Sequence, residues 1–198
     1  MLSISGLRSA HGGPFDLDLA RGECASIVGP SGVGKSLFLR LVADLDAGSG
    51  SVTLDHRLRE SWPPMAWRRQ VVYQAAEPAW WHPTVQPHFP ADSMESVRIA
   101  LALLHLPTSV LDAEVTRLST GERQRLALLR SLSRGPVVLL LDEPTASLDE
   151  ASTLAVEALL QDRVRGGLSI VWVTHSAEQA ARVSDQRYVM TREGLRRL

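Results

Sequence analysis

The chain has 198 residues, of which 44% are hydrophobic and 22% charged, enough to bury the core of one large domain. Its formal net charge of −1 gives no basic excess, which argues against a nucleic-acid-binding protein. The single cysteine, Cys24, excludes an internal disulfide or a cysteine metal cluster and indicates an inert core thiol in a reducing compartment. No run approaches the roughly 20 apolar residues that span a bilayer, and no signal peptide is visible, so we expect any membrane role to come through a partner.

The first 55 residues alternate short apolar runs with glycines and acidic residues. Phe15, Leu17 and Leu19 lie two residues apart, which is the period of a strand. We expect a small antiparallel sheet here, ECASIVG (residues 23–29) included, with one helix inside it over about residues 35–42. The sequence RRQVVYQ, residues 68–74, reads as a further strand, and four prolines between 75 and 92 disfavour regular structure there.

The rest of the chain alternates helical and strand patterns. Residues 92–106, DSMESVRIALALLHL, predict a helix capped by Asp92 or Ser93 and ended by Pro107, with a short helix after it over 108–118. Three more helices are expected to alternate with three strands, the helices over about 122–134, 152–164 and 176–184 and the strands over 136–143, 169–175 and 186–190. Such alternation predicts a parallel α/β sheet.

GPSGVGKS, residues 29–36, fits a phosphate-binding loop between an expected strand and an expected helix. Its glycines let successive N–H groups turn toward a β-phosphate, and the helix N-terminus adds a positive dipole end. Lys35 would supply charge to the β- and γ-phosphates, and the Ser36 hydroxyl would ligate Mg²⁺. The alternative is a glycine-rich turn without a ligand. The residues expected to bind nucleotide here are Gly29, Pro30, Ser31, Gly32, Val33, Gly34, Lys35, Ser36 and Leu37.

Two acidic residues end the aliphatic strand VVLLLDE, where ligands of open α/β sheets bind. Asp142 would hold Mg²⁺, through water, and Glu143 would polarise the water that attacks a γ-phosphate. His175 ends another strand, SIVWVTH, and can donate a hydrogen bond to a γ-phosphate oxygen. The alternatives are an acidic pair that caps the next turn and a histidine that is only a polar strand end.

With these motifs in place, LSTGERQRLALLRSL, residues 118–132, resembles the signature of ATP-binding cassettes, the nucleotide-binding subunits of ABC transporters, with Thr120 in place of its first glycine. LDEPTASLDE then supplies the family's Walker B strand and its D-loop, residues 146–149. The resemblance covers essentially the whole chain. It implies one α/β domain over 1–198, a P-loop core with a mostly parallel sheet, an antiparallel N-terminal β subdomain and an inserted helical subdomain over about 76–130.

The resemblance also implies a mechanism. Ser119, Thr120, Gly121, Glu122 and Asp149 would contact ATP. Among them, Ser119, Gly121 and the helix that begins near Glu122 would face the γ-phosphate held by a second cassette in a head-to-tail dimer. ATP hydrolysis would drive transport through a separate membrane permease, with the cassette cytoplasmic and peripheral on the inner face of the cell membrane. The overall pattern looks most like small bacterial cassettes of the metal (iron) export type.

Three places depart from the family pattern or depend on it. Family members usually place an aromatic residue shortly before the P-loop strand to stack on adenine, and here that stretch offers only His11 or Phe15, of which Phe15 reads as a core residue. The family's glutamine after strand 68–74 falls on Ala76, so Gln74 is the expected metal ligand, with Glu77 as a substitute. In the family this region docks the permease, so Trp80 and Trp81 are expected to form that contact, and the alternative is a local mini-core.

Two other functions remain open at this point. A soluble cassette can drive a non-transport assembly, such as iron–sulfur cluster biogenesis or cell division. A degenerate cassette can bind ATP for regulation without turnover, which Ala76 favours and the retained Lys35, Asp142, Glu143, Ser119 and His175 oppose.

Overall fold

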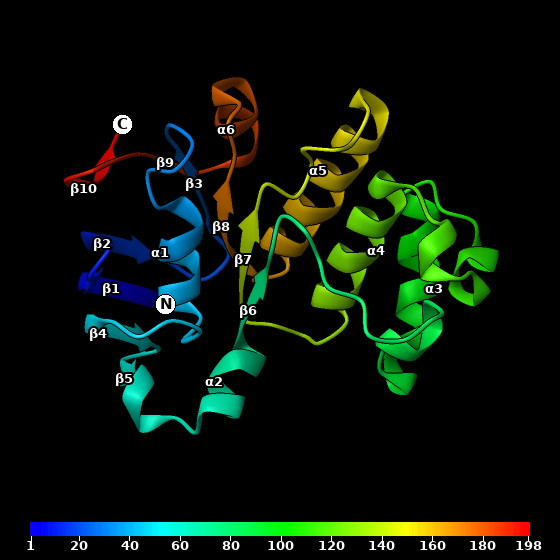
Figure 1. Cartoon of the computed structure of the whole chain (residues 1–198), viewed down its shortest axis with the longest axis horizontal. Helices are drawn as coiled ribbons and strands as arrows, with labels where there is room; N and C mark the ends of the chain where they lie inside the picture. Colours follow the sequence, from blue (N-terminus) through cyan, green and yellow to red (C-terminus); the bar gives the residue numbers. More distant parts are fainter.

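A computed structural model describes residues 1–198 and contains two sheets, with the antiparallel one at the left of Figure 1. That sheet has the order β2-β1-β4-β5. Its strands are β1 (Leu2–Ser9), β2 (Gly12–Leu19), β4 (Ser49–Leu54) and β5 (Arg57–Leu58). Phe15, Leu17 and Leu19 all point into the core, as their spacing predicts.

The second sheet has six strands in the order β10-β9-β3-β8-β7-β6. They are β3 (Cys24–Val28), β6 (Val71–Gln74), β7 (Val138–Asp142), β8 (Ser169–Val173), β9 (Gln186–Thr191) and β10 (Gly194–Arg197). All neighbours pair in parallel except β10 with β9. Every residue of β7 and β8 is buried, because both faces of the sheet are covered. The α/β fold class with a mostly parallel core is therefore confirmed.

Helices cover the two faces of this sheet and divide the core in two (Figure 1). One hydrophobic cluster joins α1 (Lys35–Val42) and the antiparallel sheet to the face that carries Val138 and Leu140. The other joins α3 (Met94–Leu103), α4 (Thr120–Leu132) and α5 (Glu150–Arg165) to the face that carries Leu139 and Leu141. The last helix, α6 (Ala177–Val183), follows β8 and packs beside β3.

The expected helical subdomain corresponds to the group of helices at the right of Figure 1. It consists of α3, most of α4 and four of the chain's short 3-10 turns. Because its apolar residues belong to the same cluster as Leu139 and Leu141 of β7, it packs onto the main sheet. Its boundaries as a separate unit stay a prediction. The 3-10 turns of the chain are Arg59–Ser61, Gln86–His88, Ala91–Ser93, Thr108–Asp112 and Val115–Arg117. None of the helices combines the length and apolar character that crossing a bilayer requires.

Two strand predictions were wrong in detail. The strand expected over 68–74 starts only at Val71, because residues 68–70 end a helix, α2 (Pro64–Gln70), that was not predicted. Proline at the first helical position favours this start, and Trp67 fixes the helix by donating its indole N–H to the Val42 carbonyl at 3.0 Å. β3 belongs to the parallel sheet rather than to the antiparallel one, as its uniform burial between β8 and β9 requires.

The short helix expected over 108–118 is also absent. Its residues form two 3-10 turns, and the extended backbone of Ala113 and Glu114 separates them. There the chain pairs with residues 83–85: the Val85 N–H donates to the Ala113 carbonyl at 3.2 Å. These hydrogen bonds to a distant segment replace those that would continue a helix.

The cap of α3 and the end of the chain differ as well. Neither Asp92 nor Ser93 caps α3 through its side chain, because the Ser93 hydroxyl donates to the Pro90 carbonyl at 2.7 Å. The chain ends with one more strand than expected, β10, which forms an antiparallel hairpin with β9.

Candidate functional site

The segment before α1 forms an open cradle at the carboxyl end of β3. Gly34 occupies the N-cap of α1 with φ of 111°, a left-handed conformation that favours glycine. No side chain caps the helix, so its first N–H groups are free to bind an anion. This arrangement is what the phosphate-binding interpretation of residues 29–37 requires.

Lys35 lies at the centre of this cradle and is only 6% exposed. Its ammonium donates to the carbonyls of Gly29 at 2.8 Å and Pro30 at 3.0 Å. Burial lowers the pKa of Lys35, while the negative charges of Glu143 and Asp142 act in the opposite direction. The loop lysine and the strand-end carboxylates therefore share one electrostatic environment.

Asp142 ends β7 and is buried beside the neighbouring strand β6. Its Oδ2 atom accepts a hydrogen bond from the hydroxyl of Tyr73 at 3.0 Å. Burial raises the pKa of Tyr73, and the charge of Asp142 raises it further, so the phenol stays protonated and acts as a donor. This contact was not expected from the sequence, although the aligned strand ends of a parallel pair could have indicated it.

Glu143 and His175 meet at the ends of β7 and β8. Oε1 of Glu143 contacts Nε2 of His175, and the histidine side chain remains 46% exposed. Glu143 has a positive φ of 49°, which is uncommon for a residue with a side chain and is a type of strain found at functional sites. The structure thus brings together Lys35, Asp142, Glu143 and His175 from three separate motifs.

Gln74 is not brought to Asp142. In β6 its side chain lies on the face of Val72, opposite to the face of Tyr73, because strand residues alternate. Gln74 is 3% exposed, and neither atom of its amide has a hydrogen-bond partner within the protein. Ala76 and Glu77 follow the strand in an exposed bend. Metal binding by Gln74, and its replacement by Glu77, stay predictions.

The signature segment starts α4 with a capping box. The Ser119 hydroxyl accepts from the Glu122 N–H at 3.2 Å, and the Glu122 carboxylate accepts from the Ser119 N–H at 2.8 Å. The Thr120 hydroxyl accepts from Arg123 at 3.3 Å. Ser119 and Thr120 are exposed, so this helix end is accessible to a second molecule.

The start of α4 packs closely against the loop that follows Glu143. A Cβ atom at Gly121 would lie 3.2 Å from Leu148 Cδ2 and 3.3 Å from the Ser147 carbonyl, which leaves little room for a larger residue. The amide of Gln124 fastens the same contact, donating to the Glu143 carbonyl at 2.8 Å and accepting from the Ser147 N–H at 3.2 Å. Gln124 lies within the signature segment of residues 118–132, but the sequence did not indicate this contact, because it joins the helix to a loop about 20 residues later.

Asp149 ends this loop as the N-cap of α5. Its carboxylate accepts from the N–H of Ser152 at 2.7 Å and from the Ser152 hydroxyl at 3.2 Å. These hydrogen bonds lower the pKa of Asp149. Asp149 is exposed and has a structural role that the motif alone did not indicate.

The two candidates for adenine stacking are very different in the structure. Phe15 is 1% exposed, and its ring packs edge-on against Phe38 at a centroid distance of 5.1 Å. His11 is exposed in the turn between β1 and β2. The structure therefore leaves His11 as the accessible one of the two.

The aromatic tract after β6 is partly a local cluster and partly a surface. Trp80 packs against the hydrophobic core, whereas Trp81 is 57% exposed. The Arg130 guanidinium carbon lies 4.6 Å from the ring centroid of Trp80 and 4.8 Å from that of Trp81. Burial, with a smaller contribution from Arg134, lowers the pKa of Arg130 to about 10, so it stays charged at neutral pH.

Comparisons with known proteins agree with this geometry. The ABC transporter family model matches residues 13–146. The chain is 36% identical over 175 residues to the probable iron export ATP-binding protein FetA of Escherichia coli (strain K12), with 83% of this chain and 78% of FetA covered. This chain belongs to the ABC transporter family. It is an ATPase of that family, and the resemblance drawn from residues 118–132 is confirmed.

Other relatives of this ABC ATPase carry different names. The aliphatic sulfonates import ATP-binding protein SsuB 3 of Rhodococcus jostii (strain RHA1) is 33% identical over 204 residues, with 98% of this chain and 72% of the relative covered. Protein STAR1 of Oryza sativa subsp. japonica is 36% identical over 180 residues, but 86% of this chain matches only 52% of its length. The chain thus spans about half the length of that relative.

Solved structures share the fold at low sequence identity. An ATP-binding subunit of an ABC transporter superposes with a TM-score of 0.88 at 20% identity, over 98% of this chain and 87% of the other. A dimeric ATP-binding cassette in a post-hydrolysis state, bound to ADP and phosphate, superposes with a TM-score of 0.85 at 21% identity, over 100% and 98%. These likenesses establish the cassette fold.

Proposed function

We propose that this ATPase powers a transporter through a separate membrane permease, and that the carboxyl ends of β3, β7 and β8 form its hydrolysis site. The assignment of the site rests on one observation: Lys35, Asp142, Glu143 and His175 converge where the carboxyl ends of these strands meet. Lys35 binds the β- and γ-phosphates, Glu143 polarises the attacking water, and His175 donates to a γ-phosphate oxygen. Phosphoryl transfer needs mainly positioning and charge stabilisation, which these groups supply.

The oxygen donors fit a magnesium ion. The Ser36 hydroxyl is exposed at the start of α1. The Asp142 carboxylate accepts a hydrogen bond from the neutral Tyr73 hydroxyl and keeps its negative charge for a metal ion. Proteins usually hold Mg²⁺ with one or two such oxygens together with substrate phosphates. When bound, the ion would offset negative charge on the β- and γ-phosphates.

We further propose that two copies pair head-to-tail. Ser119, Gly121 and the exposed start of α4 would then meet the γ-phosphate held by Lys35 of the partner copy. This is supported by the exposure of Ser119 and Thr120 and by the fold shared with a dimeric cassette. ATP would stabilise the pair, and hydrolysis would release it.

Coupling to a permease is supported by the surface after β6. Trp81 is exposed, and the guanidinium of Arg130 lies over its ring as well as over that of Trp80, so a large aromatic side chain is presented in a fixed position. The backbone beneath it is fixed because Nε2 of His88 accepts from the N–H groups of Trp81 at 3.0 Å and His82 at 3.1 Å. We propose that this surface binds the permease at the inner face of the cell membrane and that the cargo is a metal such as iron, in keeping with the name of FetA.

The test is to isolate a membrane permease that co-purifies with the chain, to reconstitute the two in liposomes and to measure ATP-dependent metal movement. Trp81→Ala should remove most of the permease-stimulated ATPase activity while the basal rate stays within twofold. Trp62→Ala is the control, and it should keep the permease-stimulated ATPase activity. The guanidinium of Arg57 lies over the Trp62 ring at 4.2 Å, but this tryptophan lies in a different part of the fold. Equal stimulation of wild type and Trp81→Ala contradicts the docking surface. Binding to a cytosolic assembly scaffold instead contradicts transport.

A further inference from the structure

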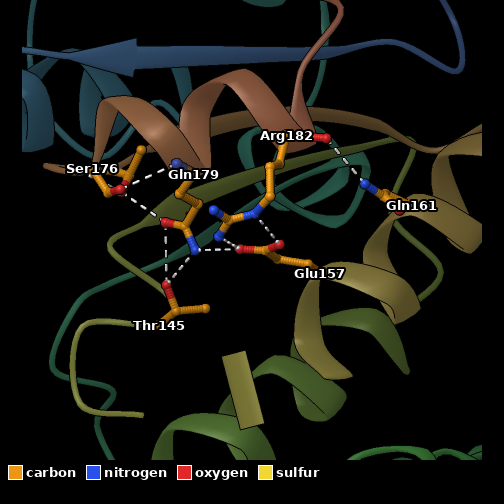
Figure 2. A network of polar contacts seen from close by, with 7 residues as sticks. Thr145, Glu157, Gln161, Ser176, Gln179 and Arg182 are labelled. Atoms are coloured by element: carbon orange, nitrogen blue, oxygen red, sulfur yellow. Dashed lines mark hydrogen bonds and ion pairs between the residues drawn. The ribbon is translucent and has the colours of Figure 1, made fainter. Parts of the chain in front are cut away.

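Gln179 of α6 has its side-chain amide at the centre of a buried polar network (Figure 2). The residue is 5% exposed. Its oxygen accepts from the Thr174 hydroxyl at 2.7 Å, and its NH₂ group donates to the Thr145 hydroxyl at 2.9 Å and to Glu157 Oε1 at 2.9 Å. Every polar atom of the amide therefore has a partner, which is what a buried amide needs to be stabilising.

The two hydroxyl partners come from the two loops that carry the site. Thr145 lies two residues after Glu143, and Thr174 lies directly before His175. Figure 2 shows the amide of Gln179 reaching toward Thr145 from its helix. Since Glu143 and His175 contact each other, one amide holds together the bases of both loops just behind their reactive side chains.

The far side of the amide is anchored by a charge pair. Glu157 of α5 is 4% exposed, and Arg182 of α6 binds both of its oxygens, at 2.8 Å and 3.1 Å. A buried carboxylate is costly without such partners, so its orientation is set by the arginine and the amide together. This pair fixes α6 against α5 and leaves the Gln179 amide few other arrangements.

We propose that Gln179 is a positioning residue for ATP hydrolysis, which sets the distance between Glu143 and His175 by tying Thr145 to Thr174. The inference rests on the roles proposed above for Glu143 and His175. Gln179 touches neither nucleotide phosphate nor water in this scheme. Its loss changes the alignment of groups that act in the transition state, and small misalignments of that kind cost rate rather than binding.

The test compares two glutamines of one network. Gln179→Leu keeps the size of the side chain and removes the bridge. It should lower kcat for ATP by at least tenfold while the Kd for ATP stays within twofold. The matched control is Gln161→Leu, because Gln161 lies at the outer end of the network and donates only to the Arg182 carbonyl, at 3.2 Å. Its kcat should stay within twofold of wild type.

Two further variants keep the test decisive if Gln179→Leu does not fold. Thr174→Val removes one hydroxyl at constant shape and should lower kcat by about threefold to tenfold, again without a change in Kd. Gln179→Glu is the conservative variant, since a protonated carboxyl keeps the acceptor for Thr174 and one of the two donated hydrogen bonds of the amide. The charged groups facing it are Glu157 and Arg182, with Glu150 and Glu178 near that arginine. Because two buried carboxylates share a proton, its activity relative to wild type should rise as the pH falls from 8 to 6.

The inference is overturned if Gln179→Leu and Thr174→Val keep wild-type kcat, or if kcat and ATP affinity fall together. Glu143→Gln is measured in parallel to separate this failure from that of the proposed site. A slow Glu143→Gln beside a fast Gln179→Leu refutes only the positioning role. A fast Glu143→Gln refutes the assigned base itself.

Discussion

The hydroxyl of Tyr73 donates to Oδ2 of Asp142 across the boundary between β6 and β7 at 3.0 Å. The donor and the acceptor are both fixed by the parallel register, which sets Tyr73 opposite Leu140 and Gln74 opposite Leu141. Tyr73 therefore contacts the Asp142 carboxylate from β6, the strand on which the sequence predicts Gln74 as a metal ligand. This contact orients the group that is proposed to hold Mg²⁺.

Tyr73→Phe keeps the ring and removes only this hydrogen bond. Removing an outer-shell hydrogen bond that orients a metal ligand typically weakens metal binding by about tenfold or more, so the Mg²⁺ concentration for half-maximal turnover should rise roughly tenfold. Mn²⁺ binding in the presence of a non-hydrolysable ATP analogue, followed by electron paramagnetic resonance, should weaken by a similar factor. Tyr188→Phe is the control, since the Tyr188 hydroxyl donates to Gln186 instead. Equal metal affinity in the two variants would show that the hydroxyl does not position Asp142.

Glu143→Gln should reduce phosphate release by at least a hundredfold and accumulate an ATP-bound dimer. The amide keeps the shape of the side chain but accepts a proton poorly, so the attacking water loses its polarising group. Phosphate release and size-exclusion chromatography with ATP measure both effects. Glu150→Gln is a suitable control, because Glu150 is exposed at the start of α5. Hydrolysis at the wild-type rate would exclude Glu143 as the base.

Lys35→Ala should abolish nucleotide binding or turnover. The ammonium is buried in the cradle and has no other cation beside it to take over phosphate binding. Fluorescent ATP-analogue titration and phosphate release report the two losses separately. Arg40→Ala, on the same helix but exposed and paired with Asp46, should leave both within twofold. Retained binding and turnover in Lys35→Ala would place the phosphates elsewhere.

His88 makes the tract beneath Trp81 sensitive to acid. Its Nε2 atom accepts two backbone N–H groups and must stay unprotonated, and burial lowers its pKa, with Arg130 and His82 adding to the effect. The folded state therefore binds fewer protons than the unfolded state below pH of about 6.5, and stability falls as the pH drops through that value. Urea unfolding at pH 7.5 and 5.5 should show this loss, and His88→Gln should reduce it. His82→Gln, at an exposed position, removes only a minor contribution to the lowered pKa of His88 and should reduce the loss much less. The same pH dependence in His88→Gln as in wild type would contradict this origin.

The parts of the molecule that follow from local rules were predictable. The phosphate loop, the aliphatic strand before Asp142 and the serine-capped helix at Ser119 each combine a residue pattern with a fixed local geometry. The strand alternation of Phe15, Leu17 and Leu19 belongs to the same class. In such segments the sequence neighbours are also the interacting partners.

Tertiary relationships were not predictable in the same way. Which face of the sheet Gln74 meets depends on how β6 packs between the two core clusters, and the unexpected helix α2 before Val71 carries no motif in the sequence. Thr145, Thr174 and Gln179 meet only because the loop after β7, the loop after β8 and helix α6 converge in the fold. No spacing in the sequence indicates that contact. The two 3-10 turns of residues 108–117 likewise depend on pairing with a segment some 30 residues earlier.

Gln124 links α4 to the loop that carries Glu143. The proposed catalytic base of one subunit and the start of α4, which would face the nucleotide of the other subunit, therefore move as one unit. In a head-to-tail pair, a shift of that loop on ATP binding at one site would move the signature helix at the other. Such a linkage predicts cooperativity between the two nucleotides, with a Hill coefficient above one for ATP. Because Gly121 packs closely against Leu148, a displacement of the loop should be passed to the start of α4 with little local rearrangement.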